Sequence, residues 1–417
     1  MPDPVIPPAS PLPPYPITDR VREALAVSLR GCEELLPQAE WLVKLARSEV
    51  TGQPLRIKLG LDPTAPDIHI GHTVVLNKMR QLQDLGHTVI FLIGDFTSMI
   101  GDPSGRNATR PPLTREQIEA NARTYYRQAS LVLDPEKTEI RYNSEWSDLL
   151  GARGMIELAA KYTLARILER DDFTKRFKAG NPISVHELLY PLMQGYDSVA
   201  LKSDLELGGT DQKFNLLVGR ALQNEYGQEP QCILTMPLLE GLDGVEKMSK
   251  SKNNYIAITE DANTMFAKVL SISDLQMWKW FELLSFRPLA QVQALRAEVQ
   301  AGRNPKDAKV QLAAEITTRF HNAASAAAAH DDFQRRAAGG VPDEIPEVLL
   351  GGAPLAIGNL LKQAGLAPST SEALRLVEQG GVRIDGTVLS DKALKVDAGS
   401  FIVQVGKRKF MRVHLSA

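Results

Sequence analysis

The feature that most constrains the fold is an alternation of strand-like and helix-like segments in the first third of the chain. Residues 55–61, 88–94 and 139–142 are rich in residues that favour strands, whereas 69–85 and 115–131 carry apolar residues at helical spacing. Strands that alternate with helices in this way form a parallel sheet covered by helices. The sequence therefore predicts an α/β fold with a doubly wound parallel, Rossmann-like sheet, whose ligands bind at the carboxyl ends of the strands.

Two histidines, His69 and His72, fall where the first of these helices begins. Free backbone N–H groups and the positive end of the helix dipole favour anions there, and imidazoles at i and i+3 lie on the same face as further donors. Gly71 has no side chain, so a nucleotide can approach the backbone closely. The pattern predicts a phosphate site. One alternative is a pair of surface histidines. A zinc site is another, but no cysteine or third ligand lies nearby in the sequence.

A second motif, Lys-Met-Ser-Lys-Ser at 247–251, lies on a loop that follows a glycine-containing turn. Ammonium groups delivered by a closing loop stabilise the negative charge of a departing pyrophosphate. We therefore predict that Lys247 and Lys250 act in catalysis and that Met248 contacts the nucleotide. For this motif taken alone, the alternative is a solvated charged loop.

A polar stripe is predicted further along the chain. Tyr190, Gln194 and Asp197 are spaced at i, i+4 and i+7 in a helix-compatible segment, so their side chains share one face. A substrate with a phenol and an ammonium would use these groups, with Asp197 as the phenol's acceptor and Asp102 as a second carboxylate. A polar face toward solvent is the alternative.

Gly208 and Gly209 end another strand-like segment, directly before a predicted helix. Glycines at this position allow a nucleoside to pack on the backbone, and a neighbouring carboxylate such as Asp211 can hold ribose hydroxyls. This turn is predicted to bind the nucleotide.

Together these residues resemble the bacterial tyrosyl-tRNA synthetases, a family of class I aminoacyl-tRNA synthetases. The runs at 69–72 and 247–251 match the family's HIGH and KMSKS motifs, 190–197 its Y-x-x-x-Q-x-x-D helix, and 208–212 its G-G-x-D-Q turn. The resemblance implies a tyrosine-tRNA ligase, which activates L-tyrosine with ATP to tyrosyl-adenylate and pyrophosphate and then transfers tyrosine to the 3'-terminal ribose of tRNA(Tyr). It implies ATP with Mg²⁺ as substrate, no tightly bound cofactor, and a homodimer.

The resemblance also assigns roles to residues. The expected catalytic residues are Thr64, His69, His72, Lys247 and Lys250. The residues expected to bind ATP are Asp62, Gly71, Gly209, Asp211, Met248 and Lys250. The residues expected to bind tyrosine are Lys58, Asp102, Tyr190, Gln194, Asp197 and Gln212, and no metal ligand is expected.

One position departs from the family pattern. Many members have a tyrosine on the first strand that shares recognition of the phenol, whereas this chain has Lys58. Strand alternation puts Arg56, Lys58 and Gly60 on one face, so Lys58 is expected to face the pocket. Either a different second partner binds the phenol, or Asp197 carries more of the discrimination.

Composition shifts and the resemblance together predict five regions. They are an extended, proline-rich N-terminal arm (1–18), a catalytic domain (19–245), the KMSKS loop with an alanine-rich helical anticodon-binding domain (246–340), a linker (341–354) and an S4-like RNA-binding domain (355–417). A helical insertion at about 151–180 is expected, on the resemblance, to form the dimer interface and to contact the acceptor stem.

The last region is the basic part of the chain. From Ala353 onward nine Lys and Arg residues face five Asp and Glu, although the whole chain has a net charge of −2. A local basic patch is the electrostatic mark of RNA binding, and a solvated charged face is the alternative. The expected tRNA-binding residues are Lys362, Arg375, Arg383, Lys407, Arg408 and Lys409.

Composition also limits the location and class of the protein. The two cysteines are far apart, and the sequence has neither a signal-peptide pattern nor a membrane-spanning apolar run. A cytoplasmic protein without membrane contact is expected. Two alternatives remain: a tryptophan-specific relative that shares the ATP motifs, and a non-catalytic RNA-binding scaffold, against which the intact histidines and lysines argue.

Overall fold

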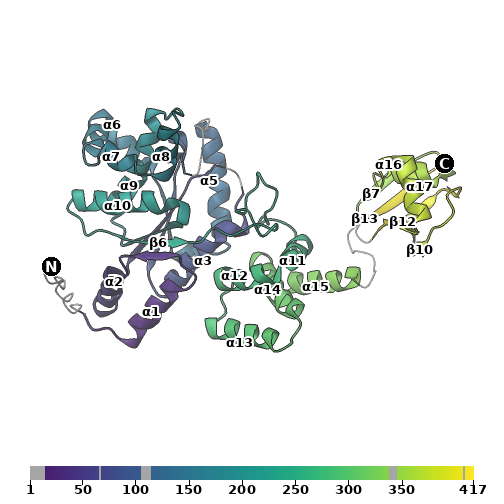
Figure 1. Cartoon of the computed structure of the whole chain (residues 1–417), viewed down its shortest axis with the longest axis horizontal. Helices are drawn as coiled ribbons and strands as arrows, with labels where there is room; N and C mark the ends of the chain where they lie inside the picture. Colours follow the sequence, from purple (N-terminus) through teal and green to yellow (C-terminus); the bar gives the residue numbers. More distant parts are fainter. Residues whose placement is uncertain (1–14, 65–66, 105–113, 338–344, 407–408) are drawn as a thin grey trace, which may run out of the picture. The chain divides into compact units, whose positions relative to one another are not determined.

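The structure, a computed structural model, describes residues 15–64, 67–104, 114–337, 345–406 and 409–417. It divides into two compact units, Met1–Asn322 and Ala323–Ala417, and Figure 1 traces the chain through both. Most of the predicted N-terminal arm lies outside the described residues. Within the described ranges, every helix is too short or too polar to cross a lipid bilayer.

A six-stranded sheet forms the centre of the first unit, in the order β1-β6-β5-β2-β3-β4. Its strands are β1 (Glu34–Leu36), β2 (Arg56–Leu61), β3 (Thr88–Ile93), β4 (Thr138–Tyr142), β5 (Leu205–Gly209) and β6 (Cys232–Met236). Strands β2 to β6 are parallel, and β1 pairs antiparallel with β6. The predicted α/β class with a doubly wound, mostly parallel sheet is confirmed.

Helices cover both faces of this sheet, and β3 and β6 are mostly apolar, as buried parallel strands are, whereas β2 carries Lys58 and β5 carries Glu206. Figure 1 shows α9 (Tyr190–Leu201) and α10 (Lys213–Glu225) on one side, with α1 (Asp19–Leu29), α2 (Gln38–Thr51) and α3 (Ile70–Asp84) on the other. Helix α5 (Arg115–Ala129) connects β3 to β4. The β2–β5 register sets Lys58 opposite Glu206.

The N-terminal segment differs from the sequence prediction. Apolar residues recur at helical spacing over 19–48, a pattern that predicts helix, whereas the chain forms α1, the short strand β1 and α2. Gly31 interrupts the helix because it adopts a left-handed φ of 61°, and Pro37 then caps α2. Three residues of edge strand are too few to show a period of two in the sequence.

The predicted helical insertion contains α6 (Ser144–Ala159), α7 (Leu164–Ile167) and α8 (Asp171–Lys178), followed by the 3-10 turn η2 (Val185–Leu189). Leu158, Ile167 and Phe173 pack in one apolar cluster with Met193 of α9 and Leu222 of α10. The insertion therefore supports α9, the helix of the polar stripe.

The region after the KMSKS loop is helical, as predicted. It contains α11 (Ala262–Ser271), α12 (Asp274–Leu284), α13 (Leu289–Gln300) and α14 (Pro305–Phe320) in the first unit, and α15 (Ala323–Ala337) in the second. Asp261, Ser273 and Asn304 cap α11, α12 and α14 by accepting hydrogen bonds from backbone N–H groups. Helix α12 packs against α3, which carries the two histidines.

The second unit contains a small α+β module. Its five-stranded sheet has the order β10-β9-β12-β13-β7 and packs with α16 (Ile357–Gln363) and α17 (Thr370–Glu378). The strands are β7 (Glu347–Leu350), β9 (Val382–Ile384), β10 (Thr387–Val388), β12 (Gly399–Val405) and β13 (Lys409–Leu415), with β8 (Leu355–Ala356) and β11 (Lys395–Val396) as a separate pair.

Strand β7 lies inside the predicted linker, 341–354. It pairs in parallel with β13, and Val348 and Leu350 pack against the module's core. The ordered module therefore begins earlier than its predicted start at residue 355. Gly351 and Gly352 follow this strand, and their linker-like composition hid it.

Candidate active site

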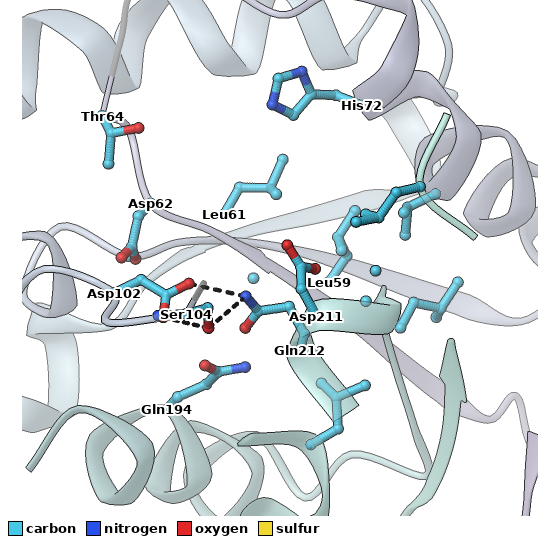
Figure 2. Close-up of a pocket in the computed structure, with 18 of the residues that line it drawn as sticks. Leu59, Leu61, Asp62, Thr64, His72, Asp102, Ser104, Gln194, Asp211 and Gln212 are labelled. Atoms are coloured by element: carbon cyan, nitrogen blue, oxygen red, sulfur yellow. Dashed lines mark hydrogen bonds between the residues drawn. The ribbon is translucent and has the colours of Figure 1, made fainter. Parts of the chain in front are cut away.

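A cavity of about 340 Å³ opens at the carboxyl ends of β2 and β5, where the strand order predicted a ligand site. Most of the predicted residues line it: Asp62, Thr64, His69, Gly71, His72, Asp102, Tyr190, Gln194, Asp197, Gly209, Asp211, Gln212, Lys247 and Met248. Lys58 and Lys250 do not line this cavity. Figure 2 shows Thr64 and His72 at one end, Gln194 at the opposite end, and Asp102 and Gln212 between them.

The two histidines cap the helix that carries them. His69 Nδ1 accepts a hydrogen bond from the Gly71 N–H at 3.1 Å, and His72 Nδ1 accepts one from the His69 N–H at 3.2 Å. Burial, reinforced by neighbouring positive groups, lowers the pKa of His69 to about 2 and that of His72 to about 4. Both rings are therefore neutral near pH 7, and because Nδ1 accepts, each carries its proton on Nε2 as a donor.

The space around Gly71 leaves no room for a side chain. A Cβ at this position would lie 2.8 Å from His69 Cε1 and 2.9 Å from His69 Nδ1. Any side chain would therefore push the His69 ring out of its capping position. The same Cβ would lie 3.5 Å from Met248 Cβ, so this turn of α3 packs closely against the KMSKS loop.

The two ATP motifs are joined by backbone hydrogen bonds. The Ile70 N–H donates to the Ile256 carbonyl at 2.9 Å, and the Ile258 N–H donates to the Ile68 carbonyl at 3.2 Å. Residues just after the KMSKS loop thus pair with residues at the start of α3. This ladder fixes the base of the loop beside the two histidines.

The lysines of the loop bind oxygen atoms of the protein. Lys247 Nζ lies 2.8 Å from Asp211 Oδ2. Lys250 Nζ donates to the main-chain carbonyl of Asp67 at 2.7 Å, and its distance to Asp67 Oδ2 is 3.8 Å. Lys247 and Asp211 both line the cavity, whereas Lys250 and Asp67 lie outside its lining.

Asn254 holds the two arms of the KMSKS loop together. Its Oδ1 accepts from the Ser249 N–H at 2.8 Å, and its Nδ2 donates to Asp243 Oδ2 at 2.7 Å. Asp243 in turn accepts from the N–H groups of Val245 and Glu246. The side chain of Asn254 is buried, so it acts as an internal brace that sequence reasoning did not identify.

Asp197 lies buried at the inner end of the cavity. Its Oδ1 accepts from Trp146 Nε1 at 2.8 Å, and its Oδ2 accepts from Asn143 Nδ2 at 3.3 Å. Burial raises the pKa of Asp197 to about 7, although Lys58 and these donors oppose the rise. Sequence reasoning missed Trp146 and Asn143. Their only signal was position, since both follow the carboxyl end of β4.

Asp102 is the second carboxylate of the cavity. It accepts from the Ser104 N–H at 2.8 Å, from Gln212 Nε2 at 2.9 Å and from Arg170 at 3.3 Å. The sequence predicted Asp102 and Gln212 but missed Ser104 and Arg170. Figure 2 shows the bonds that join Asp102, Ser104 and Gln212.

Tyr190 faces the middle of the cavity. Its hydroxyl donates to Asp62 Oδ2 at 2.9 Å, and Asp62 Oδ1 accepts from Thr97 Oγ1 at 2.7 Å. Burial, together with the nearby Asp62 and Asp102 carboxylates, raises the pKa of Tyr190 well above its ordinary value. Tyr190 is therefore a neutral donor at physiological pH.

Gln194 also lines the cavity, and its side-chain oxygen is buried. Its Nε2 lies 3.5 Å from Glu206 Oε1, whereas within the described part of the chain no donor reaches its buried Oε1. Buried polar atoms are normally hydrogen-bonded. This oxygen is therefore a candidate contact for a substrate N–H or O–H group.

Lys58 does not contact the cavity, contrary to the expectation from strand alternation. It lies on the same face of β2 as Gly60, which does line the cavity, but nearer the amino end of the strand. Its ammonium pairs with Glu206 at 3.0 Å and donates to Ser198 Oγ at 2.7 Å. Helix α9 covers it, so the predicted direct contact with tyrosine is corrected.

The predicted tRNA-binding residues lie on the second unit. Lys362 (α16), Arg375 (α17), Arg383 (β9) and Lys409 (β13) are all exposed, and Arg375 pairs with Glu372 at 2.6 Å. Lys407 and Arg408 lie outside the described residues. Four exposed basic residues on two helices and two strands can contact a polyanion.

Comparison with known families identifies both parts of the chain. The family model "tRNA synthetases class I (W and Y)" matches residues 51–337, and the "S4 domain" model matches residues 358–402. The second match confirms the S4-like prediction for the C-terminal module.

Curated relatives match over nearly the full length. The tyrosine-tRNA ligase of Cupriavidus pinatubonensis is 76% identical over 402 residues, which are 96% of this chain and 97% of the relative. That of Ralstonia nicotianae is 76% identical over 392 residues, 94% of this chain and 100% of the relative.

Solved structures show the same fold. The mitochondrial tyrosyl-tRNA synthetase of Aspergillus nidulans superimposes with a TM-score of 0.64 at 20% identity, covering 76% of this chain and 94% of that one. A tyrosyl-tRNA synthetase of Archaeoglobus fulgidus in complex with L-tyrosine gives 0.60 at 24% identity, covering 73% and 99%. At these identities the likeness concerns the fold alone.

Proposed function

The chain belongs to the class I tRNA synthetases of the W and Y family, as a tyrosine-tRNA ligase, and we propose that the cavity beside β2 and β5 performs its activation step. One observation carries the proposal: donors suited to phosphate occupy one end of the cavity, and buried polar groups suited to an amino acid with a phenol occupy the other. The carboxylate of tyrosine and the α-phosphate of ATP then meet between these two ends of the cavity.

The first reaction needs no side-chain nucleophile. A carboxylate oxygen of tyrosine attacks the α-phosphorus of ATP, a new O–P bond forms, and the bond to the bridging oxygen of pyrophosphate breaks. The products are tyrosyl-adenylate and pyrophosphate. The protein contributes by holding the reactants in line and by stabilising charge.

The phosphate end of the cavity stabilises the charge that moves. The neutral Nε2–H groups of His69 and His72 and the hydroxyl of Thr64 donate to phosphate oxygens, while Lys247 and Lys250 bind the departing pyrophosphate. Support comes from the resting contacts of the two lysines, which bind carboxylate and carbonyl oxygens in positions that phosphate oxygens can take over.

The remaining nucleotide contacts follow from position. Gly71, Gly209 and Met248 offer backbone and apolar surface to the adenosine, and Asp62 and Asp211 offer carboxylates to its hydroxyl and amino groups. Mg²⁺ enters as part of the MgATP substrate.

The other end of the cavity selects tyrosine. Asp197 accepts the phenolic O–H, since Trp146 and Asn143 hold its two oxygens in place. Asp102, Tyr190, Gln194 and Gln212 surround the ammonium end with acceptors and donors. A site that hydrogen-bonds a phenol rejects phenylalanine strongly, because buried polar groups would otherwise lose their partner, and tyrosyl-tRNA synthetases are the standard case of this effect.

In the second reaction the 3'-terminal ribose hydroxyl of tRNA(Tyr) attacks the tyrosyl carbonyl carbon, and AMP departs. We assign the exposed basic side chains of the S4 module, Lys362, Arg375, Arg383 and Lys409, to contacts with this tRNA; Lys407 and Arg408 remain predictions from sequence. We also propose a cytoplasmic location, where both ATP and tRNA are present.

A homodimer is the proposed assembly. Large apolar side chains lie exposed in the helical insertion and the turn that follows it, at Leu149, Ile156, Leu164, Phe177 and Val185, with exposed fractions of 57–82%. Concentrated exposed apolar residues mark interaction surfaces. Sedimentation of the parent chain and of Ile156→Glu tests this, and a parent that sediments as a monomer at micromolar concentration excludes it.

Amino-acid-dependent ATP–pyrophosphate exchange tests the function itself. Tyrosine should support exchange far better than tryptophan or phenylalanine. Exchange with tryptophan instead would assign the chain to the other branch of its family. RNA binding without exchange for any amino acid would indicate a non-catalytic scaffold.

A further inference from the structure

A fully buried polar cluster lies directly behind the tyrosine end of the cavity. Its centre is the ion pair between Lys58 on β2 and Glu206 on β5, with exposed fractions of 0% and 1% and a separation of 3.0 Å. Glu206 Oε2 also accepts from Gln231 Nε2 at 2.6 Å. The pair lines no part of the cavity, and the proposed mechanism does not use it.

The pair is joined to the tyrosine-binding face of α9. Lys58 Nζ donates to Ser198 Oγ at 2.7 Å and lies 3.5 Å from the main-chain oxygen of Gln194. Ser198 Oγ donates to Glu206 Oε2 at 3.0 Å, and Gln194 Nε2 lies 3.5 Å from Glu206 Oε1. The pair thus contacts Gln194 directly and, through Ser198, the residue next to Asp197.

An ion pair in this position needs a reason other than stability. Removing two charges from water costs free energy that their attraction often fails to recover, so apolar residues of similar volume usually serve a core at least as well. What apolar residues cannot do is fix the amide of Gln194 or impose a charge pattern behind Asp197.

We propose that the Lys58–Glu206 pair is a positioning element for tyrosine, which aims Gln194 and holds the α9 face so that Asp197 meets the phenol. The proposal rests on tyrosine activation in this cavity. It also accounts for the departure on the first strand: where many relatives are expected to place a tyrosine that touches the substrate, this chain has a lysine that acts from behind.

The electrostatics of Asp197 support this arrangement. The charged groups that act on it are Lys58 from β2, which lowers its pKa, and Glu206 from β5, which raises it. The other two contacts are the neutral donors Trp146 from α6 and Asn143. Lys58 acts on the pKa of Asp197 more strongly than Glu206 does, so the pair as a whole favours the ionised carboxylate.

The test is a charge-free replacement of the pair, Lys58→Met with Glu206→Gln, in the full-length chain. The glutamine keeps a carbonyl oxygen that can accept from Gln231 and Ser198, and the methionine fills most of the lysine's volume. We expect tyrosine binding by equilibrium dialysis to weaken by about tenfold or more, as for misaligned hydrogen bonds to a charged group. The KM for ATP should change by less than about twofold, because the residues at the phosphate end of the cavity are unchanged. The ratio of the kcat/KM for tyrosine to that for phenylalanine in pyrophosphate exchange should fall.

Lys44→Met is the matched control. Lys44 is buried to the same degree, with 1% exposed, and its ammonium lies 3.2 Å from Asp204, which precedes the opposite, amino end of β5, and 3.1 Å from Glu229. Losing these two ion pairs should lower the Tm without changing tyrosine affinity or selectivity. A control that weakened tyrosine binding as strongly as the double variant would overturn the proposal, because any buried pair would then have the same effect.

A double variant that folds and keeps the parental tyrosine affinity and selectivity would also overturn the proposal, since the pair would then be structural only. Should the double variant fail to fold, Ser198→Ala removes the hydroxyl that connects the pair to α9 and leaves both charges in place. It should weaken tyrosine binding by about threefold, and unchanged binding refutes the proposal. A parent chain without tyrosine-dependent exchange would instead refute the proposed function.

Discussion

At the scale of single residues, the proposed selection of tyrosine depends on how the carboxylate of Asp197 is held. Trp146 and Asn143 come from the region after β4, whereas Asp197 lies on α9. Each oxygen keeps one donor from the protein, and its other lone pairs stay available to a phenol. The acceptor therefore has a fixed direction before the substrate arrives, which is the preorganisation that makes a buried hydrogen bond selective.

The raised pKa of Asp197 predicts a pH dependence. A carboxyl group with a pKa of about 7 is protonated below that pH and loses its charge as an acceptor. We expect kcat/KM for tyrosine in pyrophosphate exchange to rise between about pH 6 and about pH 8 and then level, since this parameter reports the free enzyme. His69 and His72 titrate far below this window. A flat profile would contradict the assignment, and Asp197→Asn, which cannot titrate, should itself give a flat profile.

Trp146→Phe removes one donor from Asp197 and keeps the aromatic ring. Loss of a hydrogen bond to a charged group should reduce tyrosine-over-phenylalanine selectivity by roughly tenfold and move the midpoint of the pH profile upward, because a donor that favours the ionised form is gone. Exchange kinetics with both amino acids measure the first effect. Selectivity equal to that of the parent would show that Asp197 is aligned without Trp146.

The sequence predicted the site residues unevenly, for a physical reason. Helical spacing placed Tyr190, Gln194 and Asp197 on one stripe, and all three line the cavity. Strand alternation put Lys58 on the correct face of β2, but alternation gives no depth along the strand. Lys58 precedes Gly60 by two residues, and this is enough to bring it under α9 rather than into the cavity.

At the scale of elements, hydrogen bonds join α3 to the residues that follow the KMSKS loop. Backbone hydrogen bonds connect residues 68–70 with 256–258, and Asn254 braces the loop from within. The lysines therefore extend from a loop whose base is fixed relative to the capping histidines. In the proposed mechanism, a small motion of the loop tip brings the lysine ammonium groups to the phosphates while the base of the loop stays in place.

Lys250→Ala removes one of these charges. Because a preorganised charge at a leaving group contributes about a hundredfold or more to the rate, adenylate formation should slow by that order. Tyrosine affinity should stay close to parental, since Lys250 does not line the cavity. Single-turnover kinetics and equilibrium dialysis separate the two effects. A parallel collapse of tyrosine affinity would mean that Lys250 maintains the shape of the site.

Among the elements, short strands were the ones that sequence patterns failed to predict. β1 and β7 have three and four residues, too few to establish a period of two, and flanking Pro or Gly residues made their surroundings look like a helix end and a linker. The longer alternation of β2, α3, β3, α5 and β4 was predicted correctly because each element repeats its period several times.

At the scale of the whole molecule, the chemistry and the basic module lie on different units. Every residue that lines the cavity belongs to Met1–Asn322, and the exposed basic residues assigned to tRNA belong to Ala323–Ala417. We therefore propose a modular enzyme, in which activation of tyrosine and capture of tRNA use separate surfaces.

A chain that ends at residue 337 tests this modularity. It lacks the whole five-stranded sheet, including β7, and keeps all the cavity residues. We expect pyrophosphate exchange within about twofold of the parental rate, and charging of tRNA reduced by about tenfold or more as phosphate contacts are lost. Equal loss of both activities would show that the second unit is part of the activation site.

The most direct test of the whole account is ATP–pyrophosphate exchange by the purified full-length chain with tyrosine, phenylalanine and tryptophan compared at equal concentration. The account predicts strong exchange with tyrosine and, because Asp197 would lose its partner, a far smaller kcat/KM for phenylalanine. Exchange that is absent with tyrosine, or equal for tyrosine and phenylalanine, would contradict the central claim that a buried, ionised Asp197 selects the substrate phenol in this cavity.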